Sequence, residues 1–213
     1  MKGIYINLES RKDRRDHFEN EIKRHPFFAG IERLNAVENR DGAIGCGLSH
    51  IKGLQMFPDE SYIAIIEDDL MILDERNMAD FTNAFEKIKD LDDWKVIVLT
   101  PRGITMTEPN EIGPNEMHKN GFKRIKENQT TTGYIVKRGM IPILRENIRE
   151  AILLQIKGEH KNVSSIDQFW KGLQIEYPFY YYSGIFAGQL PGWSNIENRF
   201  VDYNERFILQ NSF

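Results

Sequence analysis

The chain has 213 residues, of which 40% are hydrophobic, 28% charged and 11% aromatic, and its formal net charge is -4. This composition is typical of a globular protein and excludes a disordered or fibrous one. The small, evenly spread charge offers no overall attraction to nucleic acid, which is therefore not expected as a partner. The single cysteine, Cys46, excludes an internal disulfide and a cysteine-based zinc cluster.

The start of the chain does not have the pattern of a targeting signal. Residues 4–8 are too short and too alternating for the core of a signal peptide. No stretch approaches the ~20 apolar residues that cross a bilayer. We therefore expect a cytoplasmic protein without a transmembrane segment, which would reach a membrane only by peripheral contact.

The first part of the chain predicts a strand, a charged helix and a second strand. The strand covers residues 4–8, the helix runs from about residue 11 to residue 23, and the second strand covers residues 31–37. Arg11 and Arg14 lie three residues apart on one face of the helix, close to the end of the first strand. Their guanidinium groups could bind a phosphate there, or the helix face could simply be solvated surface.

A glycine-rich segment at residues 40–50 leads into the next helix. A helix that begins there would offer its positive end to an anion. The spacing matches neither a Walker loop nor a dinucleotide-binding loop, so on spacing alone the glycines favour tight packing of the helix against the sheet. His50, taken by itself, is more typical of a hydrogen-bonded structural histidine than of a ligand or base.

Residues 62–70 begin as an apolar run rich in β-branched side chains and include the consecutive acids Glu67, Asp68 and Asp69. Such a run predicts a central strand buried on both faces, with the acids at its carboxyl end. If the extended geometry continues, Glu67 and Asp69 point to one side and Asp68 to the other. Oxygen ligands of this kind suit Mg²⁺ or Mn²⁺, and the alternative is a solvated acidic turn.

Hydrophobic periodicity and turn residues predict the remaining elements. They are a helix capped by Asn77, a strand at 94–99, a long loop at 101–121, strands at 122–127 and 130–136, a helix at 138–158, a short helix opened by Ser164, a strand at 177–182 and a surface tail at 188–213. In the short helix, Asp167 has the position of a first-turn acid, which commonly only stabilises the helix.

Taken together, several of these stretches resemble glycosyltransferase family 25, which includes lipooligosaccharide and collagen galactosyltransferases. The matching stretches are residues 4–8 with Arg14, 42–50, 66–69, 131–136, 166–167 and, more loosely, Gln189 with 194–196. The Gly-Cys-x-x-Ser-His segment that precedes Glu-Asp-Asp is the most specific of them.

The resemblance implies a GT-A-like fold, which is a Rossmann-type α/β sandwich with one central, mostly parallel mixed sheet flanked by helices. It implies a single domain over residues 1–213, with a nucleotide-binding part at about 1–100 and an acceptor-side part at about 101–213. The implied activity is metal-dependent transfer of galactose or glucose, with inversion, from UDP-galactose or UDP-glucose. The implied ion is Mn²⁺ or Mg²⁺, and the acceptor is a glycan, a lipooligosaccharide or a collagen-like hydroxylysine.

The resemblance also assigns roles to individual residues. It makes Glu67 and Asp69 the metal ligands and Asp167 the catalytic base that deprotonates the acceptor hydroxyl. The residues that it places at the nucleotide are Asn7, Arg11, Arg14, Ser49, His50 and Asp68.

The match departs from the family near its C-terminal end. Many members carry Ser-Asp-Ile where this chain has Asn195 between Ser194 and Ile196. If the family acid binds metal, Gln189 or Asp202 would have to replace it here, or the metal would bind more weakly. A non-catalytic module that binds nucleotide sugars or glycans is therefore an alternative. A metal-dependent phosphohydrolase is a third, which leaves the Gly-Cys-x-x-Ser-His segment unexplained.

Overall fold

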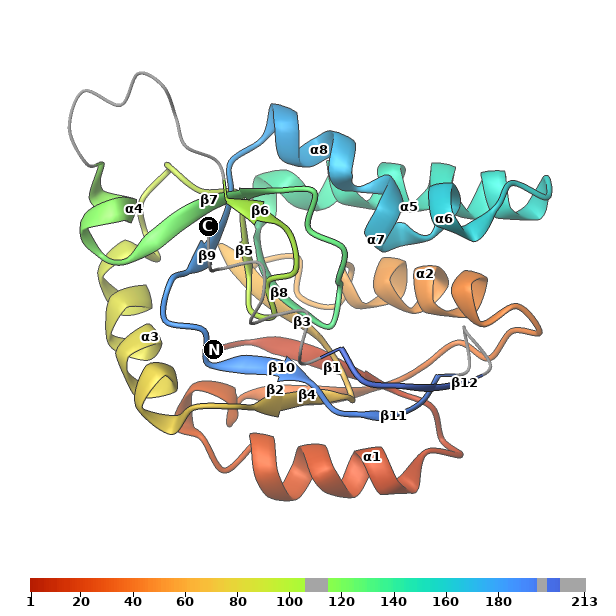
Figure 1. The fold of residues 1–213 in the computed structure, drawn as a ribbon, viewed down its shortest axis with the longest axis horizontal. Coiled ribbons are helices and arrows are strands. Elements are labelled where there is room, and N and C mark those ends of the chain that lie inside the picture. The colour runs from red at the N-terminus through yellow and green to blue at the C-terminus, as the bar shows by residue number, and fades with distance from the viewer. Residues whose placement is uncertain (106–114, 195–198, 204–213) are drawn as a thin grey trace.

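The computed structural model describes residues 1–105, 115–194 and 199–203, and its centre is one mixed sheet with helices on both faces (Figure 1). In spatial order the eight strands of this sheet are β2 (Ile31–Asn35), β1 (Gly3–Asn7), β3 (Tyr62–Glu67), β8 (Gly133–Lys137), β5 (Val96–Val98), β9 (Phe179–Tyr182), β7 (Phe122–Lys126) and β6 (Ile104–Thr105). Only β8 and β7 run against the other six. The predicted α/β sandwich with one mostly parallel mixed sheet is confirmed.

Two small antiparallel sheets and the helices complete the described part of the chain. The small sheets pair β4 (Leu70–Ile72) with β10 (Ala187–Gln189), and β11 (Gly192–Ser194) with β12 (Arg199–Val201). The α-helices are α1 (Lys12–His17), α2 (Gly42–Gly53), α3 (Glu75–Ile88), α4 (Glu116–Lys119), α5 (Ile141–Ile156), α6 (Lys161–Ser164), α7 (Ile166–Phe169) and α8 (Lys171–Glu176). A π-helical turn at Phe18–Ile22 continues α1, and 3₁₀ turns lie at Pro26–Phe28 and Arg138–Met140. Among these described elements, no helix is long and apolar enough to cross a membrane.

Strand β3 is buried on both faces, as its apolar run predicts. Ile63 and Ile65 belong to the core layer that includes buried side chains of α5, and Ala64 and Ile66 belong to the opposite layer with those of α3. None of these four side chains is exposed. Each fully buried isoleucine stabilises the fold by about 1.5–3 kcal/mol, so this strand is held rigidly and its last residue, Glu67, has a defined position.

The glycines of helix α2 allow this helix to pack closely against its neighbours, but Gly45 and Gly47 of the predicted segment meet the loop after β2 and helix α5 rather than the sheet, and only Gly53 meets a strand. A Cβ atom on Gly45 would lie 2.7 Å from the backbone oxygen of Val37. On Gly47 it would lie 3.0 Å from Ile152, and on Gly53 it would lie 2.9 Å from Ile4 of strand β1. Larger residues at these positions would push α2 away from the sheet and from α5.

Replacing Gly45 with alanine is expected to destabilise the protein by about 2 kcal/mol, because the new methyl group would collide with backbone rather than with a movable side chain. The matched control is Gly172→Ala in α8, where a Cβ atom would meet nothing within 4 Å. There the better helix propensity of alanine should stabilise by up to about 1 kcal/mol. Urea unfolding of both variants measures the difference, and equal effects would contradict the packing argument.

Four expectations differ from the structure in detail. The cap of α3 is Asp74, which accepts from the backbone N–H of Asn77. The Ser164 hydroxyl contacts carbonyl oxygens of the preceding turn, and Ser165 is the N-cap of α7. The predicted loop at 101–121 contains β6 and α4, while its residues 106–114 lie outside the described part. The described residues of the predicted surface tail at 188–213 contribute to β10, β11 and β12 and return to the carboxyl end of β3, while its residues 195–198 and 204–213 lie outside the described part.

Candidate functional site

The candidate site lies where the parallel strands β1 and β3 end, beside the first turns of α2. Asn7 and Glu67 are the last residues of these two paired strands, and Glu67 lies opposite Ile6, the residue before Asn7. In open α/β sheets, ligands bind outside the carboxyl ends of the strands, because the loops there carry variable side chains over a rigid scaffold. The buried strands β1 and β3 therefore bring the predicted nucleotide-binding and metal-binding residues to the edge of the sheet formed by their carboxyl ends.

Arg14 holds the two aspartates of the acidic segment together. Its Nη1 atom donates to Oδ1 of Asp68 at 3.0 Å and to Oδ2 of Asp69 at 2.9 Å, and all three side chains are largely buried. The second oxygen of Asp68 accepts from Nδ2 of Asn7 at 2.7 Å. Burial raises the pKa of Asp69 to about 7, against the opposing charge of Arg14, and burial also raises the pKa of Asp68. One guanidinium thus compensates two carboxylates only in part.

Asp69 also has an oxygen that no described group satisfies. Its Oδ2 accepts from Nε2 of Gln189 as well as from Arg14, but its buried Oδ1 has no hydrogen-bond partner within the described residues. Buried carboxylate oxygens are normally paired, and an orphan next to other carboxylates suits a hard divalent cation. The residues present therefore fit a Mg²⁺ or Mn²⁺ ion.

Glu67 points away from this pair, toward α2. Its Oε1 lies 3.3 Å from Nε2 of His50 and accepts from the hydroxyl of Thr131 at 2.8 Å. Burial alone would raise the pKa of Glu67, but the hydrogen bonds from His50 and Thr131 lower it overall. The expected alternation is wrong, because β3 ends at Glu67 and the chain turns at Asp68 and Asp69.

Two adjoining cavities open at this edge of the sheet. The smaller has a volume of about 460 Å³, and its lining includes Arg11, Arg14 and Asp68. The larger has a volume of about 840 Å³, and its lining includes Arg102 and Asp167. Both lie in the size range of small-molecule sites, roughly 300–1,000 Å³. They meet along residues that line both, which are Cys46, Glu67, Gln189 and Ser194.

The structure brings most of the predicted nucleotide residues to the smaller cavity. Its lining contains Arg11, Arg14, Ser49, His50 and Asp68. Ser49 is buried and donates to the carbonyl of the residue one helical turn earlier, while its oxygen accepts from a backbone N–H after β2. The backbone oxygen of Trp193 lies 3.5 Å from Nη1 of Arg11 and 3.4 Å from Nη2 of Arg14.

Asn7 lies behind this cavity. It is 1% exposed, its Nδ2 donates to Asp68, and its Oδ1 accepts from Nε of Arg33 at 2.9 Å. Arg33 in turn pairs with Glu9. Asn7 is therefore placed to orient Asp68.

Asp167 lies on the wall of the larger cavity, in the first turn of α7. Burial raises the pKa of its carboxyl to about 6, Arg102 opposes this rise and Glu67 adds to it. A carboxyl with a pKa near neutrality is suited to take a proton from a bound hydroxyl group. Asn195, at the position where many family members have an acid, lies outside the described residues. Gln189, one proposed replacement, contacts Asp69, whereas Asp202 lines neither cavity.

Comparison with known proteins identifies the family. A sequence model described as glycosyltransferase family 25 (LPS biosynthesis protein) matches residues 40–156, which is more than half of the chain. The chain belongs to glycosyltransferase family 25. No curated protein sequence matched it.

Solved structures similar to this family 25 chain include the following three. A glycosyltransferase involved in the glycosylation of the major capsid of PBCV-1 is 10% identical, with 99% of this chain and 98% of that chain covered and a TM-score of 0.49. A UDP-glucose pyrophosphorylase complexed with UDP-glucose is 12% identical, with 98% and 79% covered and a TM-score of 0.46. A mannose-1-phosphate geranyltransferase from Thermus thermophilus is 13% identical, with a TM-score of 0.40. The alignment covers 86% of this chain but only 59% of that enzyme's chain.

The family match includes the centre of the site but not all of it. Cys46, His50 and the acids 67–69 fall within residues 40–156, whereas Arg14, Asp167 and Gln189 fall outside. Thr131 and Tyr134 were predicted only as part of the family stretch 131–136, without individual roles, and Arg102 was not predicted as a site residue. A signal for Thr131 existed in the run of three threonines before β8, but a hydroxyl-rich run alone does not specify its partner.

Arg14→Gln is expected to lower the free energy of unfolding by about 3 kcal/mol, because it leaves two buried carboxylates without their cation. The matched control is Arg15→Gln on the same helix, whose side chain is 46% exposed. That change should cost less than about 0.5 kcal/mol. Denaturant unfolding at pH 7.5 measures both, and similar values for the two variants would contradict the bridging role of Arg14.

Proposed function

We propose that this chain is a metal-dependent hexosyltransferase that moves galactose or glucose from a UDP-sugar to a glycan-type acceptor with inversion. The observation that carries the proposal is the junction of two cavities at Glu67 and Gln189. One cavity carries arginines and the carboxylates of the acidic segment, and the other carries Asp167. Family membership supports sugar transfer as the class of reaction.

In this proposal the smaller cavity takes the nucleotide diphosphate. The guanidinium groups of Arg11 and Arg14 give it positive charge, which suits phosphate oxygens. Asp69 would hold Mn²⁺ or Mg²⁺, and Glu67 would become a second ligand once its carboxylate turns from His50 and Thr131 toward Asp69. The ion would supply Lewis-acid stabilisation of the negative charge on the departing diphosphate. The free Oδ1 of Asp69 supports its part in this ligand set.

The larger cavity would take the acceptor, with its hydroxyl group toward Asp167. Asp167 accepts the hydroxyl proton while the acceptor oxygen forms a bond to the anomeric carbon. The bond from that carbon to the phosphate oxygen breaks, and its electron pair leaves with UDP. A single displacement of this kind inverts the configuration, because the nucleophile and the leaving group occupy opposite sides of the sugar. The acceptor would be a glycan, a lipooligosaccharide or a collagen-like hydroxylysine.

A panel of UDP-sugars tests the proposal. Purified protein is incubated with each UDP-sugar, with and without Mn²⁺, and UDP release and thermal stabilisation are measured. We expect UDP-galactose or UDP-glucose to give both signals only with the metal. Stabilisation without UDP release, even with oligosaccharide acceptors, would indicate a non-catalytic binding module. No response to any UDP-sugar or to metal would overturn the proposal.

A further inference from the structure

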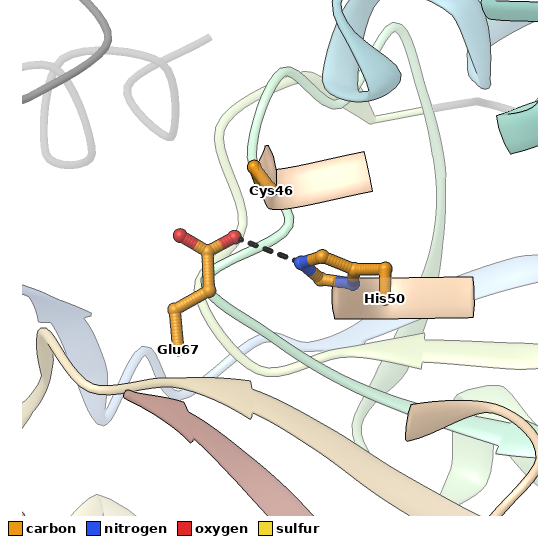
Figure 2. Close-up of side chains that lie close together, drawn as sticks. All are labelled: Cys46, His50 and Glu67. Carbon is orange, nitrogen blue, oxygen red and sulfur yellow. Dashed lines mark hydrogen bonds and ion pairs between the residues drawn. The ribbon is translucent and has the colours of Figure 1, made fainter. Parts of the chain in front are cut away.

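Three different metal-ligating side chains lie together where the two cavities meet: Cys46 and Glu67 line both cavities, and His50 lines the smaller one. Cys46 and His50 are four residues apart on α2 and so lie on one helical face, and Glu67 approaches from the end of β3 (Figure 2). One ligand atom of each residue lies within 4.8 Å of those of the other two. The mechanism proposed above uses Glu67 but has no role for Cys46 and none for the imidazole beyond the cavity wall.

Hydrogen bonds from surrounding residues fix the orientation of two of these ligands. Nδ1 of His50 lies 3.0 Å from the hydroxyl of Tyr134, which directs Nε2 toward Glu67. A tyrosine hydroxyl can donate or accept, so it can keep this contact when Nε2 gives up its proton to become a ligand. Thr131 donates to the carboxylate of Glu67. Supporting contacts of this kind are typical of metal sites, where they set the tautomer of the histidine and the direction of the carboxylate.

The donor set indicates which cation would bind. One sulfur, one imidazole nitrogen and one carboxylate oxygen suit Zn²⁺, whereas Mg²⁺ and Mn²⁺ favour oxygen ligands. Three protein ligands leave the fourth tetrahedral position open. Because Cys46 and Glu67 line both cavities, that position would face the space between them. A single cysteine excludes clusters of several thiolates, but it is compatible with a site that combines one thiolate with other ligand types.

We propose that Cys46, His50 and Glu67 form a binding site for a borderline-soft divalent cation of the zinc type, separate from the orphaned oxygen of Asp69. The site has a functional consequence that rests on the proposed function. Glu67 belongs to both ligand sets, so a zinc-type ion at Cys46 and His50 withdraws it from the Mn²⁺ site. Such an ion would therefore inhibit sugar transfer.

Cobalt titration tests the binding directly, because a thiolate bound to Co²⁺ gives a sulfur-to-metal charge-transfer absorption. The chain has one cysteine, so any such absorption must come from Cys46. We expect one Co²⁺ per chain, displacement by one Zn²⁺ and loss of the absorption in Cys46→Ser. His50→Gln should weaken binding at least tenfold, and Tyr134→Phe should weaken it by about tenfold while the absorption remains. The matched control, His118→Gln in α4, lines neither cavity and should bind as the unaltered protein does.

Several outcomes would overturn the site. They are the absence of charge-transfer absorption in the unaltered protein, one Co²⁺ per two chains, and unchanged affinity in a folded His50→Gln variant. Far-ultraviolet circular dichroism shows whether each variant folds. If one does not, cobalt binding by the unaltered protein still tests whether the site exists.

The activity measurement separates this inference from the proposed function. Stoichiometric Zn²⁺ should inhibit Mn²⁺-dependent UDP release in the unaltered protein, and the turnover that remains in Cys46→Ser should resist the same Zn²⁺. If no UDP-sugar is turned over, the proposed function is wrong, but the cobalt titration still tests the zinc-type site because it does not depend on turnover. If turnover is present and the cobalt absorption is absent, the zinc-type site fails alone.

Discussion

Asp69→Asn is expected to reduce kcat/KM for sugar transfer by about 10³-fold, which corresponds to about 4 kcal/mol of transition-state stabilisation. Asp69 is 4% exposed, and its Oδ1 lacks a partner among the described residues, so this oxygen is available to a cation. The substitution keeps the shape of the side chain but removes the charge that attracts the ion. Binding of UDP should then lose its dependence on Mn²⁺.

Titration calorimetry of UDP, with and without Mn²⁺, and steady-state kinetics measure this effect. The matched control is Asp80→Asn on the exposed side of α3, which should leave both quantities unchanged. Asp68→Asn should have a smaller effect than Asp69→Asn, because both oxygens of Asp68 already accept hydrogen bonds, from Asn7 and Arg14. Undiminished Mn²⁺-dependent UDP binding in both Asp69→Asn and Glu67→Ala would refute the metal site.

Asp167→Asn is expected to reduce kcat by about 10²–10⁴-fold, the usual contribution of a positioned general base. UDP binding should be nearly unchanged, because Asp167 lines the larger cavity and not the smaller one. The matched control is Glu176→Gln, an exposed acid at the end of the nearby helix α8. If Asp167 served only as a first-turn acid of α7, both substitutions would leave turnover almost intact.

The pH profile gives a second, independent measurement of Asp167. The pKa of its carboxyl is raised to about 6, chiefly by burial, and a base must be unprotonated to act. With Mn²⁺ at a concentration that saturates its site and so keeps Asp69 ionised, we therefore expect kcat/KM to be constant above this pKa and to fall about tenfold for each pH unit below it. The slope should disappear from the residual activity of Asp167→Asn. A profile with no change in slope between pH 5 and pH 7 would argue against Asp167 as the base.

The same raised pKa has a consequence for stability. A carboxyl whose pKa is higher in the folded than in the unfolded protein binds its proton more tightly when folded. The free energy of unfolding therefore decreases as pH rises from the unfolded pKa through about 6. Above this range the ionised carboxyl lowers the free energy of unfolding by a constant amount. Asp167→Asn should accordingly unfold at a higher temperature than the unaltered protein at pH 8, while being less active. Such an opposition is common for catalytic groups.

Patterns along the chain predicted the strands that build the site. A strand buried on both faces has a continuous apolar run, which can be recognised without knowing which strands or helices pack against it. Residues 62–70 were assigned in this way, and β3 confirms their strand as far as Glu67. The predicted directions of the Asp68 and Asp69 side chains, by contrast, were wrong. Alternation of side chains holds only while the backbone stays extended, and the turn at Asp68 and Asp69 is set by contacts from other segments, including Arg14 and Gln189.

Local sequence patterns were enough to predict the α/β class, the acidic strand end, the packing role of the glycines and the resemblance to family 25. These features depend on periodicity, on local backbone preference and on short motifs, all of which lie within a few residues of one another. The fold was needed to show that Arg14 joins Asp68 to Asp69, that Cys46 and His50 face Glu67, and that Asp167 lines the cavity that adjoins them. These contacts join residues far apart in the chain, and the order of strands in the sheet determines which of them meet.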